Sequence, residues 1–257
     1  VFLNSAGAYG IKIGEPMGAF IAALVGVEIG KFISGKTKVD IVLVPSSVII
    51  AGGIAGKYIS PVVSAIMAAF GSIINTATVM NPIPMGILVS AIMGVVLTLP
   101  ISSAALAIAL GLNGLAGGAA TVGCCTQMVG FAVASYRENK MGGLIAQGIG
   151  TSMLQVPNII KNPMIWIPPT LASAILGPLS TTLFKMENVP EGAGMGTSGL
   201  VGQFGTFAAM SGTNGGGIIL LKILILHILL PAILTLIISE YMRKKGYIKT
   251  GDMKLEL

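Results

Sequence analysis

Charged side chains are scarce in this sequence. Only 9% of its 257 residues are Asp, Glu, Lys or Arg, whereas 54% are hydrophobic, and an ordinary soluble domain has about 25% charged residues. The chain therefore lacks the polar side chains that would cover a water-soluble fold of this length. The shortage indicates an all-helical, polytopic membrane protein whose first partner is the lipid bilayer.

Cysteine and aromatic residues are also few, with two Cys and one Trp. Cys124 and Cys125 are adjacent, which is a strained geometry for a disulfide, and no metal-ligand spacing surrounds them. We interpret them as small residues at a helix contact and expect neither a metal nor a cofactor. No phosphate-binding loop, zinc-protease motif or nucleophile elbow is present, so we assign no catalytic residue.

Acidic residues are outnumbered, and the net charge is +6. The basic residues stand between apolar runs and in the C-terminal tail rather than among aromatics, which argues against nucleic-acid binding. Basic residues gather on the cytoplasmic side of membrane proteins. We therefore predict a cytoplasmic C-terminal tail, on the same side as the loops over residues 34–40 and 136–143.

Long apolar runs and glycine are abundant, with 36 Gly residues in the chain. Glycine lets membrane helices approach closely and supports interrupted helices. The first run is either one long helix or two halves broken at Gly14–Pro16, and residues 61–80 read as an interfacial helix that begins at Pro61. The predicted spans are residues 7–33, 41–60, 83–99, 115–136, 164–184 and 216–239.

Two further apolar runs, residues 101–112 and 144–156, are too short to cross a bilayer and predict two re-entrant hairpins. Such breaks at membrane depth commonly line a solute site. Their neutral hydroxyls and amides suit a hydroxyl-rich solute, or an anion held by N–H donors. Alternatively, these side chains only bond helices together. The candidate solute-binding residues are Ser102, Ser103, Gln127, Gln147, Thr151, Ser152, Gln155 and Asn158.

Ionisable residues inside apolar segments are costly and suggest a function. Glu15, Glu187 and His227, the only histidine, are the candidates. For His227 the alternative is a packed residue at a helix contact. Glu28 and Lys31 stand three residues apart and are expected to form an ion pair.

The chain begins at Val1, and no basic segment precedes a short apolar core, so we predict no signal peptide. We expect the natural protein to have further N-terminal helices. Residues 1–239 are predicted to form one transmembrane domain, followed by a cytoplasmic tail over residues 240–257.

Several strings of the sequence resemble one known family. They are GIKIGEPMGAFIAALVGVEIGK at residues 10–31, the long stretch 97–169 that includes LTLPISSAALAIALGLNG and AQGIGTSMLQVPNIIKNP, and FKMENVPEGAGMGTSGLVGQ at residues 184–203. They resemble the EIIC-like membrane proteins of the bacterial phosphotransferase system, in the group that includes the perfringolysin O regulator. The resemblance covers nearly the whole chain. It implies an EIIC-like bundle and a multi-pass protein of the bacterial cytoplasmic membrane.

This resemblance also implies a homodimeric permease that moves a small polar solute, such as a sugar, with separate IIA and IIB phosphocarrier proteins. Sugar-transporting EIIC permeases use a His near the first hairpin and a Glu near the second. Here the matching strings, Pro100–Ser103 and Gly148–Ser152, contain neither. The chain is therefore at most the membrane subunit of a sugar phosphotransferase. The alternative is a membrane sensor or regulator that retains a solute pocket without transport or phosphotransfer.

Overall fold

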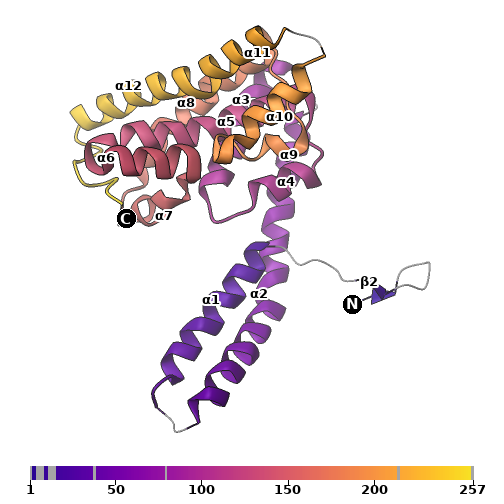
Figure 1. The fold of residues 1–257 in the computed structure, drawn as a ribbon, viewed down its shortest axis with the longest axis vertical. Helices are drawn as coiled ribbons and strands as arrows, with labels where there is room; N and C mark the ends of the chain where they lie inside the picture. Colours follow the sequence, from indigo (N-terminus) through magenta and orange to yellow (C-terminus); the bar gives the residue numbers. More distant parts are fainter. Residues whose placement is uncertain are drawn as a thin grey trace. The chain divides into compact units, whose positions relative to one another are not determined.

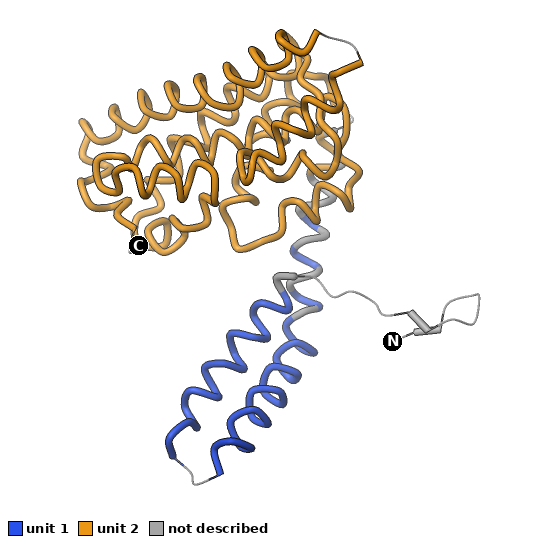
Figure 2. Tube along the Cα trace, in the orientation of Figure 1, with its two compact units in different colours: residues 1–70 blue, residues 71–257 orange. Residues whose placement is uncertain are grey.

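The computed structural model describes residues 2–3, 9–10, 16–36, 39–78, 80–212 and 215–255. These residues are helical, as the sequence predicted, apart from turns and one antiparallel pair of two-residue strands, β1 (Phe2–Leu3) and β2 (Tyr9–Gly10). The chain divides into two units, residues 1–70 and residues 71–257 (Figure 2), and each is described by itself.

Unit 1 contains a helical hairpin made by α1, Pro16–Ile33, and the first part of α2, Asp40–Thr78 (Figure 1). The two helices approach each other closely through small residues. A Cβ atom built on Gly26 would lie 2.8 Å from the carbonyl oxygen of Val48. Glycine therefore allows the backbone of α1 to touch that of α2, as is common between membrane helices.

The surface of this hairpin is apolar. Phe32, Ile41 and Ile49 are 70%, 88% and 72% exposed, which suits contact with lipid. The predicted ion pair is confirmed, with Lys31 Nζ at 3.9 Å from Glu28 Oε1. Both side chains are largely exposed, so the pair adds little stability.

The predicted helix boundary at Pro61 is wrong. Separate helices were expected over residues 41–60 and 61–80, but α2 is one helix of 39 residues that contains both Pro45 and Pro61. Proline is tolerated inside membrane helices because neighbouring groups and local adjustments satisfy the freed carbonyl. The interfacial position of residues 61–80 stays a prediction.

The central helix of unit 2 is α5, Gly114–Ala134 (Figure 1). Every residue from Gly117 to Ala132 is buried. Close approach depends again on glycine, because a Cβ atom on Gly123 would collide with the carbonyl oxygen of Ser90. Helix α5 packs against α3 (Pro82–Thr98), α8 (Ile167–Pro178) and α12 (Leu230–Lys244).

Shorter helices connect these elements. In chain order they are α4 (Ser103–Ala109), α6 (Tyr136–Ile145), η1 (Ala146–Gly150), η2 (Ser152–Gln155), α7 (Val156–Lys161), η3 (Pro163–Trp166), η4 (Leu179–Leu183), α9 (Pro190–Ala193), η5 (Ser198–Leu200), α10 (Val201–Met210), α11 (Gly216–Ile223) and η6 (Leu224–Leu229). Three of them, η1, η4 and η6, are π-helices. Such segments are rare and occur frequently at functional sites.

Within the described residues, three helical stretches are long and apolar enough to cross a membrane: Asp40–Ile59, Gly114–Ala134 and Gly216–Lys244. They overlap three of the predicted spans. The predicted span over residues 83–99 corresponds to α3, which is apolar but shorter. The short run predicted at residues 101–112 contains α4, which has only 7 residues. The re-entrant path of the two short runs stays a prediction.

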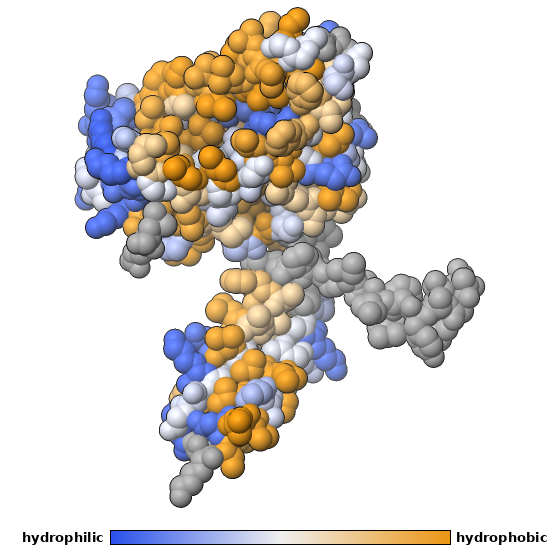
Figure 3. Space-filling view, in the orientation of Figure 1, coloured by the Kyte–Doolittle hydropathy of each residue, from blue (hydrophilic) through white to orange (hydrophobic). Residues whose placement is uncertain are grey.

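One end of unit 2 is rich in hydrophilic side chains (Figure 3). In Figure 3, apolar side chains cover the visible face over α8, α11 and α12, and hydrophilic ones gather where α12 ends and α6 begins. Two ion pairs join these segments, Arg137 Nη2 to Glu240 Oε2 at 3.2 Å and Arg243 Nη2 to Glu138 Oε1 at 3.1 Å. The polar segment 136–143, which was expected to be a loop, belongs to α6 and lies beside the end of α12.

Residues 245–255, here named the C-terminal strap, fold back onto α6 and α7. Ile248 and Met253 are buried in an apolar cluster with Phe131 and Ile165. The strap is thus packed against unit 2 along most of its length, and it brings its backbone carbonyls to the side chains of α6, η2 and α7.

Candidate functional site

Among the interruptions of the helices in the described part of unit 2, three carry or adjoin the predicted site residues or the contacts between them. The first break, residues 99–102, separates α3 from α4, and Leu99 in it is extended. The second break, residues 146–151, is a π-helix followed by the extended Thr151. The third break, residues 184–200, contains short α9 between extended and turn segments. Free N–H and C=O groups at such breaks need protein, water or solute partners at membrane depth.

Side-chain hydroxyls at the edges of the first break reach the other two breaks. The hydroxyl oxygens of Thr98 and Ser152 lie 2.9 Å apart, which joins the first break to the second. The Ser103 hydroxyl donates a hydrogen bond of 2.6 Å to the carbonyl of Gly194, which joins the first break to the third. Thr98, Ser103 and Ser152 are all buried.

The Thr197 hydroxyl completes the set by joining the third break to the second. It donates a hydrogen bond of 2.5 Å to the carbonyl of Gly148, and the Thr197 side chain is buried. Three interruptions that are far apart in the sequence therefore meet in one part of unit 2. We name these three contacts the ties.

Gln127 of α5 adjoins the tie at Thr98. Its Oε1 accepts a hydrogen bond of 3.3 Å from the Thr98 hydroxyl, and its Nε2 donates one of 2.9 Å to the hydroxyl of Thr170 on α8. Together with Ser152, these side chains form a largely buried polar group, here named the Gln127 cluster. The sequence predicted Gln127 and Ser152, but Thr98 and Thr170 were missed because they stand in runs that read as ordinary apolar helix.

Gln147, Gln155 and Asn158 form a second polar group, here named the amide chain. Gln155 Nε2 donates to Gln147 Oε1 at 2.8 Å, and Asn158 Nδ2 donates to Gln155 Oε1 at 2.9 Å. At its inner end, Gln147 Nε2 donates to the Ser135 hydroxyl at 2.8 Å. The short helix η2 carries both Ser152 of the Gln127 cluster and Gln155 of the amide chain, so the two groups are neighbours in the fold.

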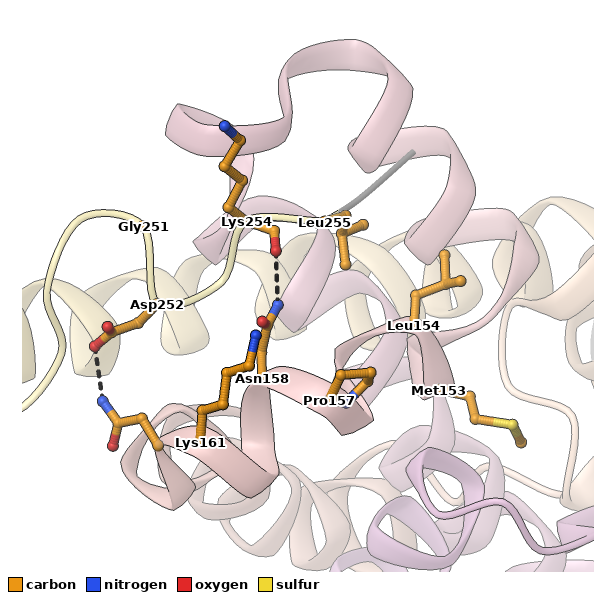
Figure 4. Close-up of a pocket in the computed structure, with 10 residues that line it drawn as sticks. Met153, Leu154, Pro157, Asn158, Lys161, Gly251, Asp252, Lys254 and Leu255 are labelled. Carbon is orange, nitrogen blue, oxygen red and sulfur yellow. Dashed lines mark hydrogen bonds between the residues drawn. The ribbon is translucent and has the colours of Figure 1, made fainter. Parts of the chain in front are cut away.

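The amide chain ends at the C-terminal strap. Gln155 Nε2 donates to the carbonyl of Met253 at 3.0 Å, and Asn158 Nδ2 donates to the carbonyl of Lys254 at 2.9 Å (Figure 4). Residues of η2, α7 and the strap, Asn158 among them, line a cavity of about 810 Å³. The amide chain therefore leads from the buried Ser135, at the end of α5, to this cavity.

Ser102 and Thr151 have a different role from the other predicted residues. The Ser102 hydroxyl accepts a hydrogen bond from the backbone N–H of Ala105, and the Thr151 hydroxyl accepts one from Met153. Both contacts cap the start of a short helix by satisfying a free N–H group. The remaining predicted residues take part in the ties, the Gln127 cluster or the amide chain: Ser103, Gln127, Gln147, Ser152, Gln155 and Asn158.

Of the predicted charged residues, Glu187 and His227 are described, and neither takes part in the ties. Glu15 lies outside the described residues, and Glu187 is half-buried in the third break. His227 is fully buried in η6, where its Nδ1 lies 3.2 Å from Nε2 of Gln203. The same Gln203 nitrogen lies 3.3 Å from Sγ of Cys125, which is buried and unbridged.

Asn188 is a polar residue of the third break that the sequence reasoning missed. Its Nδ2 donates to the Thr121 hydroxyl at 2.6 Å and to the Gly202 carbonyl at 3.0 Å, and its Oδ1 accepts from the N–H of Val189 at 2.8 Å. Asn188 therefore holds the third break against α5 and α10. An asparagine two residues before a proline, here Pro190, is a turn signal that would have indicated it.

Comparison with protein families decides what kind of protein this is. The family model described as Phosphotransferase system, EIIC, matches residues 1–255. The chain belongs to the EIIC family. No curated protein and no solved structure matched in the corresponding searches. The resemblance drawn from the sequence strings is confirmed. EIIC proteins are the membrane permease components of sugar phosphotransferase systems and work with IIA and IIB proteins.

The breaks of this EIIC chain carry mainly neutral hydrogen-bonding groups. Residues 99–103 and 148–152 contain no acidic or imidazole side chain, and the carboxylates of the third break are Glu187 and Glu191. Glu191 is exposed. Among the described residues, no cluster of three or more His, Cys, Asp or Glu side chains could hold a metal ion. The ties, the Gln127 cluster and the amide chain can therefore bind hydroxyl or amide groups through hydrogen bonds.

Proposed function

We propose that this EIIC chain is the permease core that moves a small polar solute, with a sugar as the first candidate, past the three breaks. The observation that carries the proposal is the set of ties made by Ser103, Thr197 and the Thr98–Ser152 pair. Interrupted helices that meet at membrane depth supply free backbone groups to a solute in secondary transporters. Because the ties are hydrogen bonds of neutral hydroxyl groups, breaking them leaves no charge buried.

The proposed solute site comprises the Gln127 cluster and the amide chain. Their amides and hydroxyls bond to one another and to the strap, so a solute hydroxyl that replaces one of these partners exchanges one hydrogen bond for another. Such an exchange has a small net free energy, about 0.5–1.5 kcal/mol per bond. A pathway needs this property, because a solute must be able both to bind and to leave.

The proposal includes the membrane topology that the sequence predicts. Segments 101–112 and 144–156 form the re-entrant hairpins, residues 61–80 lie along the interface, and residues 1–239 form the transmembrane domain. The basic segment 240–257 faces the cytoplasm of a bacterial cell, as the positive-inside rule requires. The working unit is a homodimer that acts together with separate IIA and IIB phosphocarrier proteins.

Uptake by reconstituted vesicles tests the proposal. Purified protein is reconstituted and offered radiolabelled glucose, maltose, N-acetylglucosamine and mannitol, with and without phosphorylated IIA and IIB proteins. We expect saturable uptake of at least one of them, and at least a tenfold loss with Gln127→Leu. Ser47→Ala is the matched control, since Ser47 bonds only the Val44 carbonyl within α2. If the protein binds a sugar but transports none under either condition, it is not a permease.

A second candidate function, a membrane sensor without transport, is favoured by the strap. The carbonyls of Met253 and Lys254 occupy the donors of Gln155 and Asn158, which belong to the proposed solute site. A solute that takes these N–H groups competes with the strap, and such coupling acts in both directions. Solute binding would therefore release the strap and signal to the cytoplasm.

Strap mobility separates the two candidates. A nitroxide label is placed on Lys254→Cys in a chain that also carries Cys124→Ala and Cys125→Ala, and its mobility is recorded while the same sugars are added. A sensor shows increased label mobility without uptake. A permease shows uptake, whether or not the strap moves.

A further inference from the structure

A groove of unit 2, here named the Arg137 groove, lies where the chain passes from α5 to α6, beside α12. It has a volume of about 520 Å³ and is lined by residues of these three helices. Its apolar part is formed by Val133 of α5, Leu144 of α6 and Leu236 of α12. The volume falls within the range of about 300–1,000 Å³ that is usual for small-molecule sites. The groove shares no lining residue with the ties, the Gln127 cluster or the amide chain.

The groove carries one cation and one anion side by side. Among the described residues that line it, the charged ones are Arg137 and Glu240, and Arg137 Nη2 lies 3.2 Å from Glu240 Oε2. Their side chains are 66% and 37% exposed, so a ligand can reach both. A guanidinium has several N–H donors and a carboxylate several acceptor positions, so their contact with each other leaves hydrogen-bonding groups available on each.

The groove lies at the boundary between apolar and hydrophilic surface. Leu236 and Glu240 stand one helical turn apart on α12, so the wall of the groove changes from apolar to charged within that turn. Figure 3 shows the same change of surface where α12 ends and α6 begins. Three of the five Tyr residues, Tyr136, Tyr241 and Tyr247, are exposed on α6, on α12 and on the strap. Because tyrosine is enriched at the level of lipid headgroups, the charged pair belongs at that level.

We propose that the Arg137 groove binds one phospholipid whose zwitterionic headgroup carries a primary ammonium, as in phosphatidylethanolamine. The headgroup phosphate accepts hydrogen bonds from the Arg137 guanidinium, and the ammonium donates to the Glu240 carboxylate. Two carbons join the phosphate to the ammonium in this headgroup, so both groups can meet the adjacent pair. One acyl chain lies along the apolar part of the groove. Each of the four charges then has a partner of opposite sign.

The headgroup rather than the acyl chain decides which lipid binds. Lipid tails are as apolar as leucine, so a chain gains little when it moves from the bilayer into the groove. Phosphatidylglycerol brings a phosphate to Arg137 but no ammonium to Glu240. Phosphatidylcholine has the same two charges as phosphatidylethanolamine, but its quaternary ammonium has no N–H group to donate. The Glu240 carboxylate therefore favours phosphatidylethanolamine over both.

Native mass spectrometry of the detergent-solubilised protein tests this assignment. The protein is titrated separately with phosphatidylethanolamine, phosphatidylcholine and phosphatidylglycerol of identical acyl chains, and the dissociation constant of the first bound lipid is measured. We expect phosphatidylethanolamine to bind about fivefold or more tightly than either of the others, the effect of one hydrogen bond to a charged group. Equal binding of the three lipids, or tighter binding of phosphatidylglycerol, overturns the proposal.

Two variants assign the preference to the charged pair. Arg137→Met should weaken phosphatidylethanolamine and phosphatidylcholine alike, about fivefold or more, because it removes the donors to the phosphate that both lipids carry. Glu240→Met should abolish only the preference for phosphatidylethanolamine over phosphatidylcholine. Lys140→Met is the matched control, since Lys140 is an exposed cation of α6 that does not line the groove.

The variants also show how the proposal fails. A preference that survives in Glu240→Met, or an equal loss of binding in Arg137→Met and Lys140→Met, overturns it. The experiment measures lipid binding without any sugar or transport, so its outcome is independent of the permease proposal.

Discussion

The Thr197 hydroxyl donates a hydrogen bond of 2.5 Å to the Gly148 carbonyl and so joins residues 49 positions apart in the chain. This contact is the one direct tie between the second and third breaks among the described residues. Because Gly148 belongs to the π-helix η1, its carbonyl lies at an interrupted stretch of backbone. The position of one break therefore depends on the other.

We expect Thr197→Val to loosen this arrangement. The substitution keeps the shape of the side chain but removes the donor to Gly148, and it should lower the free energy of unfolding by about 1–2 kcal/mol. Thr182→Val is the control, since the exposed Thr182 bonds only the carbonyl of Pro178, four residues earlier in the chain. Thermal unfolding in detergent measures both variants. An equal loss of stability in the two variants would show that the tie adds nothing to the stability of the fold.

Asn188→Asp should be more damaging than its small change of shape suggests. The aspartate loses both donors, to the Thr121 hydroxyl and the Gly202 carbonyl, at a fully buried position. An unpaired carboxylate there should cost at least about 3 kcal/mol, by analogy with breaking a buried charged pair. The matched control is Asn113→Asp, because Asn113 is exposed and its side chain caps no helix. Expression yield and Tm that stay near those of the control would contradict this role.

Two glycine substitutions should have opposite effects. A Cβ at Gly123 collides with the backbone carbonyl of Ser90, so Gly123→Ala must push α3 from α5 and should cost about 1–3 kcal/mol or more. Nothing lies within 4 Å of a Cβ at Gly142, which stands in α6, so Gly142→Ala should be neutral or add about 0.5–1 kcal/mol. Their Tm values, measured side by side, check the sign of each effect.

The ion pair of Arg243 and Glu138 should matter far more than that of Arg137 and Glu240. The first pair is nearly buried, whereas the second is largely exposed. Arg243→Met alone leaves a buried carboxylate and should cost about 3–5 kcal/mol, most of which Glu138→Leu should restore in the double variant. Arg137→Met should cost about 1 kcal/mol or less. A double variant no more stable than Arg243→Met alone would show that the charge of Glu138 is satisfied by other groups.

Much of the fold followed from local patterns. The helix predicted over residues 83–99 is α3, Pro82–Thr98, because an uninterrupted apolar run between prolines leaves few alternatives. The boundary predicted at Pro61 was wrong, because proline removes one hydrogen bond but does not by itself end a helix whose neighbouring turns are sound. Pro61 was therefore read as the start of a new helix, whereas it lies inside a continuous one.

The candidate site was predictable in part, because some of its residues stand out from their local sequence. Gln127, Gln147 and Gln155 stand out as amides within apolar runs, and the structure gives each of them hydrogen-bonded partners. Thr98 and Asn188 do not stand out, because threonine is common in apolar helices and asparagine in loops. Their importance comes from partners 54 and 67 residues away, Ser152 and Thr121.

The sequence by itself determined that this protein is helical, lies in lipid and has first and second breaks that carry neutral polar groups. These properties follow from composition and from the length of each apolar run, which any local reading detects. Only the tertiary structure decided which polar groups meet, namely that Thr197 reaches Gly148 and that Gln203 reaches His227. Those pairings depend on which helices become neighbours, and helix packing is set by shape over the whole of unit 2 rather than by any single segment.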